Sequence, residues 1–217
     1  MTHHISRRLR RGPAMLLLTL LMAGGHAAAD VASLQAAWAH AMYELAGDAR
    51  QDAMAELTGQ SRGEAEAHPD DPATLIWNGI ILSSYAGEKG GLGALGLVKE
   101  ARRSLEHALE IDPGALQGSA HTSLGSLYYK VPGWPLGFGN DKEARRHLLA
   151  ALNLNPTGID PNYFMGEFLM EQGEYAAARR HLETALAAPD RPQRTLADQG
   201  RRQEIQALLA RLDEQSR

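Results

Sequence analysis

The stretches ARRSLEHAL (residues 101–109), ARRHLLAAL (144–152) and ARRHLETAL (178–186) are three versions of one segment. In each of them, small or apolar residues recur at positions i, i+4, i+7 and i+8, which is the spacing of one face of an α-helix. Each segment is soon followed by a proline, a residue that stops a helix. The three stretches therefore predict three equivalent amphipathic helices.

A second helix is expected upstream of each segment. Its marks are a glycine with apolar or aromatic neighbours, at Gly79, Gly125 and Gly166. Small residues at such positions let two helices approach closely. The spacing from Ala144 to Ala178 is 34 residues. A non-repetitive helical bundle is the alternative, but three matches that share helix, stop and period argue against chance recurrence.

This pattern resembles the tetratricopeptide repeat, a helix-turn-helix unit of 34 residues with W/L-G-x2-Y, then A-x3-F/L-x2-A and a closing proline. The resemblance implies an all-α fold, a right-handed superhelical solenoid of antiparallel helix pairs. Residues 30–217 would form this domain. Its expected parts are a degenerate first repeat at about 30–70, repeats at 72–115, 118–158 and 159–192, and a polar capping helix at 195–213.

Helix starts fit this division of the chain. Asp71 and Asp160 each precede a proline, as an N-cap residue does before a proline at the first helical position. Asn140 with Glu143 is typical of a capping box.

Two inter-helix loop insertions are expected, because Ala101 and Ala144 are 43 residues apart. The glycine-rich segment 86–96 would be the first insertion, and segment 131–140 (VPGWPLGFGN) the second. Stacked repeats would place both at one edge of the solenoid, and loops on a rigid scaffold often carry binding. Trp134 and Phe138 in the second insertion either bind a partner or fill a gap between widened repeats.

The second insertion and the turn around residues 155–164 (NPTGIDPNYF) are similar to TatT-like proteins, periplasmic tetratricopeptide proteins associated with TRAP-type solute transporters. The likeness covers roughly residues 71–209. It implies a link to a transporter component and, for this chain, a small-ligand-binding role.

The N-terminus predicts export. Four arginines between Arg7 and Arg11 precede an apolar run at 15–22, and small residues follow at 26–29, as in a secretory signal peptide of residues 1–29. A membrane anchor is the alternative, but it needs about 20 apolar residues. We expect a periplasmic protein without a stable membrane anchor after cleavage.

Without residues 1–29, 18 lysines and arginines face 26 acidic residues, a net charge of −8. This charge argues against nucleic acid as a partner, because phosphate binding needs a basic face. The chain has no cysteine, so packing alone must stabilise it.

A tetratricopeptide solenoid binds on a concave face lined by the first helix of each pair. Candidate binding residues on this face and in the second insertion are Ser83, Ser84, Thr122, Ser126, Tyr129, Lys130, Trp134, Phe138, Tyr163, Glu167 and Met170, with Ile76, Ile80 and Glu171 at further positions of the face. Such a groove suits an extended peptide or an amphipathic helix.

No catalytic motif, metal-ligand spacing or cofactor motif is present, and we expect no enzyme, metal or cofactor. His147 and His181 occupy equivalent repeat positions and are predicted to face solvent. The sequence thus favours a soluble exported adaptor for a protein or peptide. The alternative is a small-ligand receptor, which would have a cavity beneath the Trp134 loop.

Overall fold

The computed structural model describes Met1 and residues 23–215, with side chains from residue 31 on. Over residues 23–215 the chain is built from helices without strands, which confirms the all-α class. The predicted signal peptide lies outside the described residues, apart from Met1 and the backbone at the start of α1. The helices are α1 (Ala23–Glu44), α2 (Gly47–Ala67), α3 (Pro72–Lys89), α4 (Gly91–Ile111), α5 (Ala115–Lys130), α6 (Asp141–Leu154), α7 (Ile159–Glu171), α8 (Tyr175–Leu186), the short 3-10 helix η1 (Pro192–Arg194) and α9 (Thr195–Gln215).

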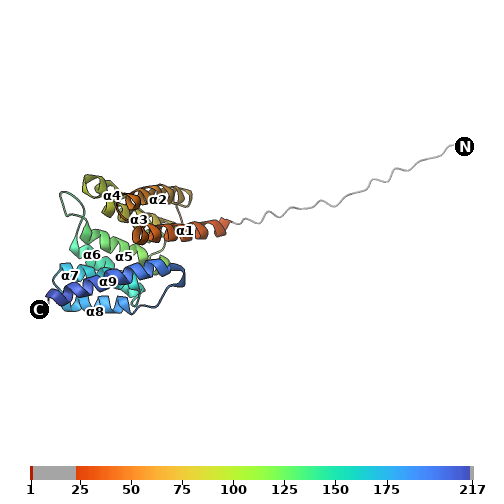
Figure 1. The fold of residues 1–217 in the computed structure, drawn as a ribbon. Helices are drawn as coiled ribbons and strands as arrows, with labels where there is room; N and C mark the ends of the chain where they lie inside the picture. The colour runs from red at the N-terminus through yellow and green to blue at the C-terminus, as the bar shows by residue number, and fades with distance from the viewer. Residues whose placement is uncertain (2–22, 216–217) are drawn as a thin grey trace.

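Helices that follow one another in the chain pack side by side (Figure 1). The most extensive contacts join α3 with α4, α5 with α6, and α7 with α8. Helices α1, α3, α5 and α7 also contact one another in that order and form a continuous row. None of the helices within the described residues is long and apolar enough to cross a membrane.

The three main helix pairs meet at a glycine of the first helix and a leucine of the second. A Cβ atom built on the glycine would lie within 2.7 Å of the leucine Cγ in all three pairs, which are Gly79 with Leu105, Gly125 with Leu148, and Gly166 with Leu182. No larger residue fits such a crossing without movement of the helices, so the glycines marked by the sequence allow the close approach.

Two of the three expected helix caps are confirmed. The Asp71 carboxylate accepts hydrogen bonds from the backbone N–H groups of Ala73 and Thr74, and Asn140 Oδ1 accepts from those of Lys142 and Glu143. The prediction for Asp160 is wrong, because α7 begins at Ile159, two residues earlier than expected, and its N-cap is Gly158.

The first expected insertion is not a loop. Segment 86–96 continues α3 to Lys89 and begins α4 at Gly91. The chain turns at Gly90, whose φ of 60° is readily adopted by glycine. The glycines beyond this turn are compatible with helix, so the extra residues lengthen two helices. Segment 131–140, by contrast, is a non-helical loop between α5 and α6.

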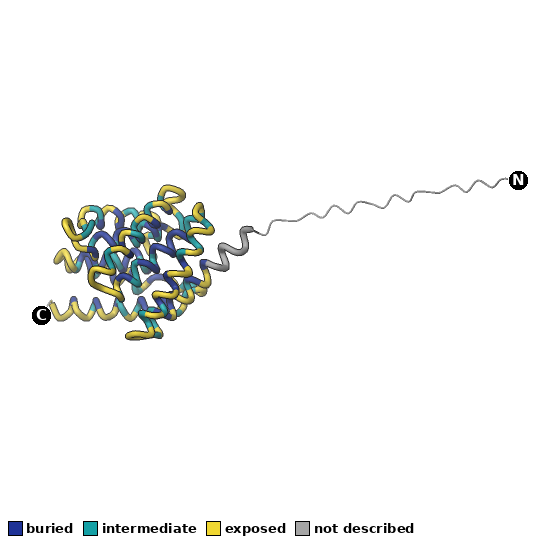
Figure 2. Tube along the Cα trace, turned by 90° about the horizontal axis from the view of Figure 1, so that it is seen from above, coloured by how far each residue is buried: buried dark blue, intermediate teal, exposed yellow. Residues whose placement is uncertain are grey.

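Buried residues follow the contact faces of the helices, and exposed residues lie on loops and along the last turns of α9 (Figure 2). The core has two clusters. One runs from α3 to α9, and the other joins α1, α2 and α3 around Trp38 and Trp77. Ala197 of α9 belongs to this second cluster, so the last helix packs against the first part of the chain. This contact closes one side of the row formed by α1, α3, α5 and α7.

Candidate functional site

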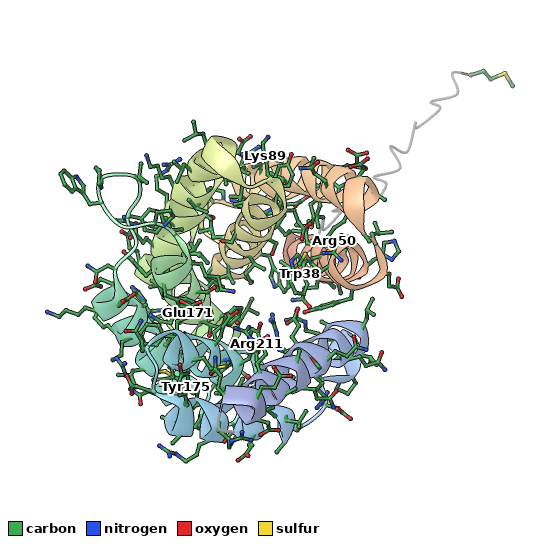
Figure 3. All side chains as sticks on the ribbon, turned by 60° about the vertical axis from the view of Figure 1, so that its left-hand side comes forward. Trp38, Arg50, Lys89, Glu171, Tyr175 and Arg211 are labelled. Atoms are coloured by element: carbon green, nitrogen blue, oxygen red, sulfur yellow. The ribbon has the colours of Figure 1, made fainter. Side chains whose placement is uncertain are left out.

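A polar groove of about 310 Å³ lies along the row of first helices. Helices α1, α3, α5 and α7 line it, and η1 and α9 close it on one side. Its walls are formed by Trp38, Met42, Tyr43, Trp77, Ile80, Ser83, Ser84, Gly87, Glu88, Ser119, Thr122, Ser123, Ser126, Lys130, Asp160, Tyr163, Phe164, Arg194, Arg201 and Glu204. In Figure 3 the labelled side chain of Trp38 lies near the middle of the ring of helices.

An apolar pocket of about 520 Å³ adjoins this groove. Residues from α3, α4 and α5 line it, together with Val131, Pro132 and Leu136 of the loop between α5 and α6. Both hollows include Ser83, Gly87, Ser126 and Lys130 in their walls, so the two hollows are adjacent and share these residues. The lining of the apolar pocket is Ser83, Ala86, Gly87, Gly91, Leu92, Ala94, Leu95, Val98, Ser126, Leu127, Lys130, Val131, Pro132 and Leu136.

Six of the candidate binding residues line the polar groove, namely Ser83, Ser84, Thr122, Ser126, Lys130 and Tyr163, and Ile80 from the further positions of the face lines it too. The hydroxyl of Ser83 donates to the backbone oxygen of Gly79 at 2.7 Å. The hydroxyl of Ser84 donates to its own helix and accepts from Trp38 Nε1 at 2.8 Å. The Ser84 hydroxyl therefore holds the indole of Trp38 in place.

Tyr129, Lys130 and Glu167 form a small polar cluster. The Tyr129 hydroxyl donates to Glu167 Oε2 at 2.5 Å, and Lys130 Nζ lies 2.7 Å from the same oxygen. Burial, followed by the negative charge of Glu167, raises the pKa of Tyr129 well above its usual value. Of this cluster only Lys130 lines the two hollows; Tyr129 and Glu167 line neither, and nor do Met170 and Glu171 one turn farther along α7.

The structure places the remaining predicted residues differently. Ile76 is fully buried in the core and is absent from the groove wall, so the prediction for it is wrong. Phe138 packs edge-on against Tyr128, with ring centroids 5.6 Å apart, and Arg102 lies over its other side. Phe138 therefore fills a gap between helices. Trp134 is 90% exposed and fills none.

Helix α9 contributes a charged cluster that the sequence did not reveal. Arg201 is buried with its guanidinium beside the rings of both Tyr163 and Phe164, and its Nε lies 3.1 Å from Asp160 Oδ1. Arg191 lies 2.9 Å from the other oxygen of Asp160. Burial alone would raise the pKa of Asp160, but the positive charges of Arg201, Arg191 and, more weakly, Arg194 outweigh it and lower the pKa to about 2. Asp160 therefore serves as a charged link between α7 and α9.

The sequence carried one signal of this contact, the glycine in the middle of α9. A Cβ on Gly200 would lie 2.2 Å from Cδ1 of Tyr43, so α9 and α1 meet at this residue. A glycine that interrupts a helix often marks a close approach. The polar residues around it are those of a terminal cap, and the sequence gives no indication that they turn inward.

Arg194 is the least satisfied cation of the groove. Its guanidinium lies 4.9 Å from the ring of Trp77 and has no ion pair within the described part of the chain. Burial lowers the pKa of Arg194, which means that its positive charge is incompletely compensated. An anionic group in the groove would compensate it.

The expectation that His147 faces solvent is wrong. His147 is buried, stacks on Tyr128 and lies 2.9 Å from His121, measured between the two Nδ1 atoms. His181, at the equivalent position, is half-buried and bonded to Asn162. The side chains from residue 31 on contain no group of three or more potential metal ligands. The two histidines are therefore internal links of their helix pairs.

Comparison with models of protein families gives no match to this chain, and comparison with curated proteins gives none either.

Proposed function

We propose that this chain is a binding protein whose guest is a small amphipathic carboxylate. The observation that carries the proposal is that the apolar pocket and the polar groove are adjacent and share four wall residues. A pocket of about 520 Å³ lies within the usual range of ligand sites, about 300–1,000 Å³. An aliphatic chain would occupy the pocket beneath the loop 131–140.

Arg194 would bind the carboxylate at the other end of the site. Its guanidinium carries donors in a planar arrangement that matches a carboxylate. The guanidinium lies over the ring of Trp77, 4.9 Å from its centroid. Lys130 is less suitable for this role, because Glu167 already neutralises it at 2.7 Å. The guest would therefore lie with its charge towards α9 and its apolar part towards α4.

Calorimetric titration with decanoate tests this function. We expect binding by the unmodified chain, loss of about tenfold or more in affinity for Arg194→Gln, which removes a charge-assisted hydrogen bond, and loss of binding for Ala94→Trp, which fills the pocket. Ala176→Trp, at an exposed position on α8, is the matched control and should bind normally. If decanoate bound all three variants as it binds the unmodified chain, the proposed site would be wrong.

A second candidate is an adaptor for a protein or peptide. It is favoured by hydroxyl-bearing residues on two neighbouring first helices, Ser84 of α3 and Thr122 and Ser126 of α5, which line a groove that could take an extended peptide. Peptides with and without a free C-terminal carboxylate, tested against the same variants, separate the two candidates. Tight binding of a peptide that Ala94→Trp leaves unchanged would favour the adaptor.

We infer further that the chain is a right-handed tetratricopeptide solenoid of TatT-like type, exported to the periplasm and linked to a transporter component. Three glycine–leucine crossings at equivalent positions support the repeat. The N-terminal arginines and the apolar run that follows them support export. Mass spectrometry of the protein from a periplasmic extract tests the last point, and a mature chain that begins at Asp30 is the expected result.

A further inference from the structure

The loop between α5 and α6 exposes apolar side chains to an unusual degree. From Val131 to Gly139 the indole N–H of Trp134 is the only polar side-chain group. Trp134 is 90% exposed and Leu136 is 65% exposed. Surface loops are normally polar, because exposing a large apolar side chain to water does not stabilise the fold. This loop therefore has the composition of a contact surface.

The apolar surface continues on the first turn of α4. Leu92 is 86% exposed, and it lines the same pocket opening as Leu136. Among side chains from residue 31 on, Leu92, Trp134 and Leu136 are the most exposed large apolar ones, and the next is Leu149 at 50%. We name these three residues the apolar rim.

Basic residues flank the rim. Lys99 and Arg103 of α4 line a shallow hollow together with Pro135 and Leu136, and neither has an ion pair within the described residues. The acidic side chain in this hollow, Glu106, is neutralised by Arg102 at 2.7 Å.

A third cation is Lys89, the last residue of α3. Its side chain lies against the first turn of α4, because a Cβ built on Gly93 would be 2.9 Å from the Lys89 Cε. Figure 3 shows Lys89 at the edge of the molecule beside α4. The surroundings of the apolar rim are thus cationic, although residues 30–217 together carry a net charge of −8.

We propose that the apolar rim and its three cations dock the protein reversibly on an anionic lipid bilayer. Tryptophan prefers the interface between lipid and water, and lysine and arginine are attracted to anionic headgroups. A stable protein partner needs about 800 Å² of complementary surface on each side. Three side chains that project from a loop and a helix end instead suit insertion into a soft interface. The proposal goes beyond the binding function, and it would place the opening of the apolar pocket against lipid.

The test uses the full chain and vesicles of phosphatidylcholine with or without 30% phosphatidylglycerol. Trp38 and Trp77 are buried, so a change in tryptophan emission on vesicle binding reports Trp134. We expect a shift to shorter wavelength with anionic vesicles and little shift with neutral ones. The shift should disappear in Trp134→Ala. Every variant retains residues 1–29, so binding through that segment is common to all of them.

The role of the flanking cations is tested by the double variant Lys99→Glu, Arg103→Glu. Its partition to anionic vesicles should be weaker by roughly tenfold or more. Leu149→Ser and Arg211→Glu change exposed residues away from the rim and are the controls. Circular dichroism checks that each variant is folded. The proposal is overturned by an unchanged Trp134 emission with anionic vesicles, by equal binding to neutral vesicles, or by rim variants that behave like the controls. Emission that responds to an added protein and not to lipid would assign the rim to that protein.

Discussion

Gly125 shows how a single residue sets the distance between α5 and α6. A Cβ at this position would lie 2.7 Å from Leu148 Cγ and 3.2 Å from the Leu148 backbone nitrogen. We therefore expect Gly125→Ala to lower the free energy of unfolding by about 1–3 kcal/mol through overpacking. Gly63→Ala in α2 is the matched control, since nothing lies within 4 Å of its Cβ, and it should be neutral or stabilising by about 0.4–1 kcal/mol. Urea unfolding measures both, and equal effects would contradict the close crossing.

His147 makes stability depend on pH. Burial, the charge of Arg146 and the neighbouring His121 lower the pKa of His147 from 6.5 to about 4. Between these values the unfolded state binds more protons than the folded state, so stability falls as pH falls from 6.5 towards 4 and is unaffected above 6.5. One pKa unit corresponds to about 1.4 kcal/mol, which places the loss at about 3 kcal/mol.

Substitution His147→Gln removes this titration. The urea midpoint of the variant should change less than that of the unmodified chain between pH 6.5 and 4. His107→Gln, at an exposed position on α4, should keep the original slope. If the urea midpoint of His147→Gln changed with pH as much as that of the unmodified chain, the pH dependence would belong to other groups.

At the scale of elements, α9 holds the polar groove in shape through its contact with α1. Gly200→Ala would bring a methyl group onto the ring of Tyr43, since a Cβ there lies 2.2 Å from Cδ1. We expect amide hydrogen exchange in α1 and in the first turns of α9 to accelerate by about tenfold, while α4 to α6 keep their protection. Gly59→Ala, in open space on α2, is the control. An equal acceleration of amide hydrogen exchange in all helices would contradict the view that Gly200 affects only the contact between α1 and α9.

At the scale of the whole molecule, the contact between α1 and α9 joins the two core clusters into one cooperative unit. The cluster around Trp38 and Trp77 includes Ala197 from α9, and residues such as Ile80 and Tyr85 pack against both clusters. In a Trp134→Phe background the emission comes from the two buried tryptophans. It should change at the same urea concentration as the helical signal in circular dichroism. Two separate midpoints would show that the first helices unfold independently.

The sequence alone determined the helices and their closest crossings. Its signals were local, because the i, i+4 spacing, the stopping prolines, the caps Asp71 and Asn140 and the glycines 79, 125 and 166 each act within one helix or one helix pair. Six groove residues followed from the same period, because the first helices share one orientation. The prediction for Ile76 was wrong because this residue, although on the same face of α3 as Ile80 one turn later, lies where that face is covered by the core.

The tertiary structure alone decided what closes the groove and what is left uncovered. Arg201 reaches Asp160 across 41 residues of chain, and no local pattern distinguishes an arginine that turns inward from one that caps a solenoid. Segment 86–96 became helix because packing against α3 and α5 stabilises its residues more than its glycines destabilise them. Phe138 packs against Tyr128, whereas Trp134, four residues earlier in the same loop, is exposed to solvent. Such outcomes depend on the space that distant helices leave, which the order of residues along the chain does not express.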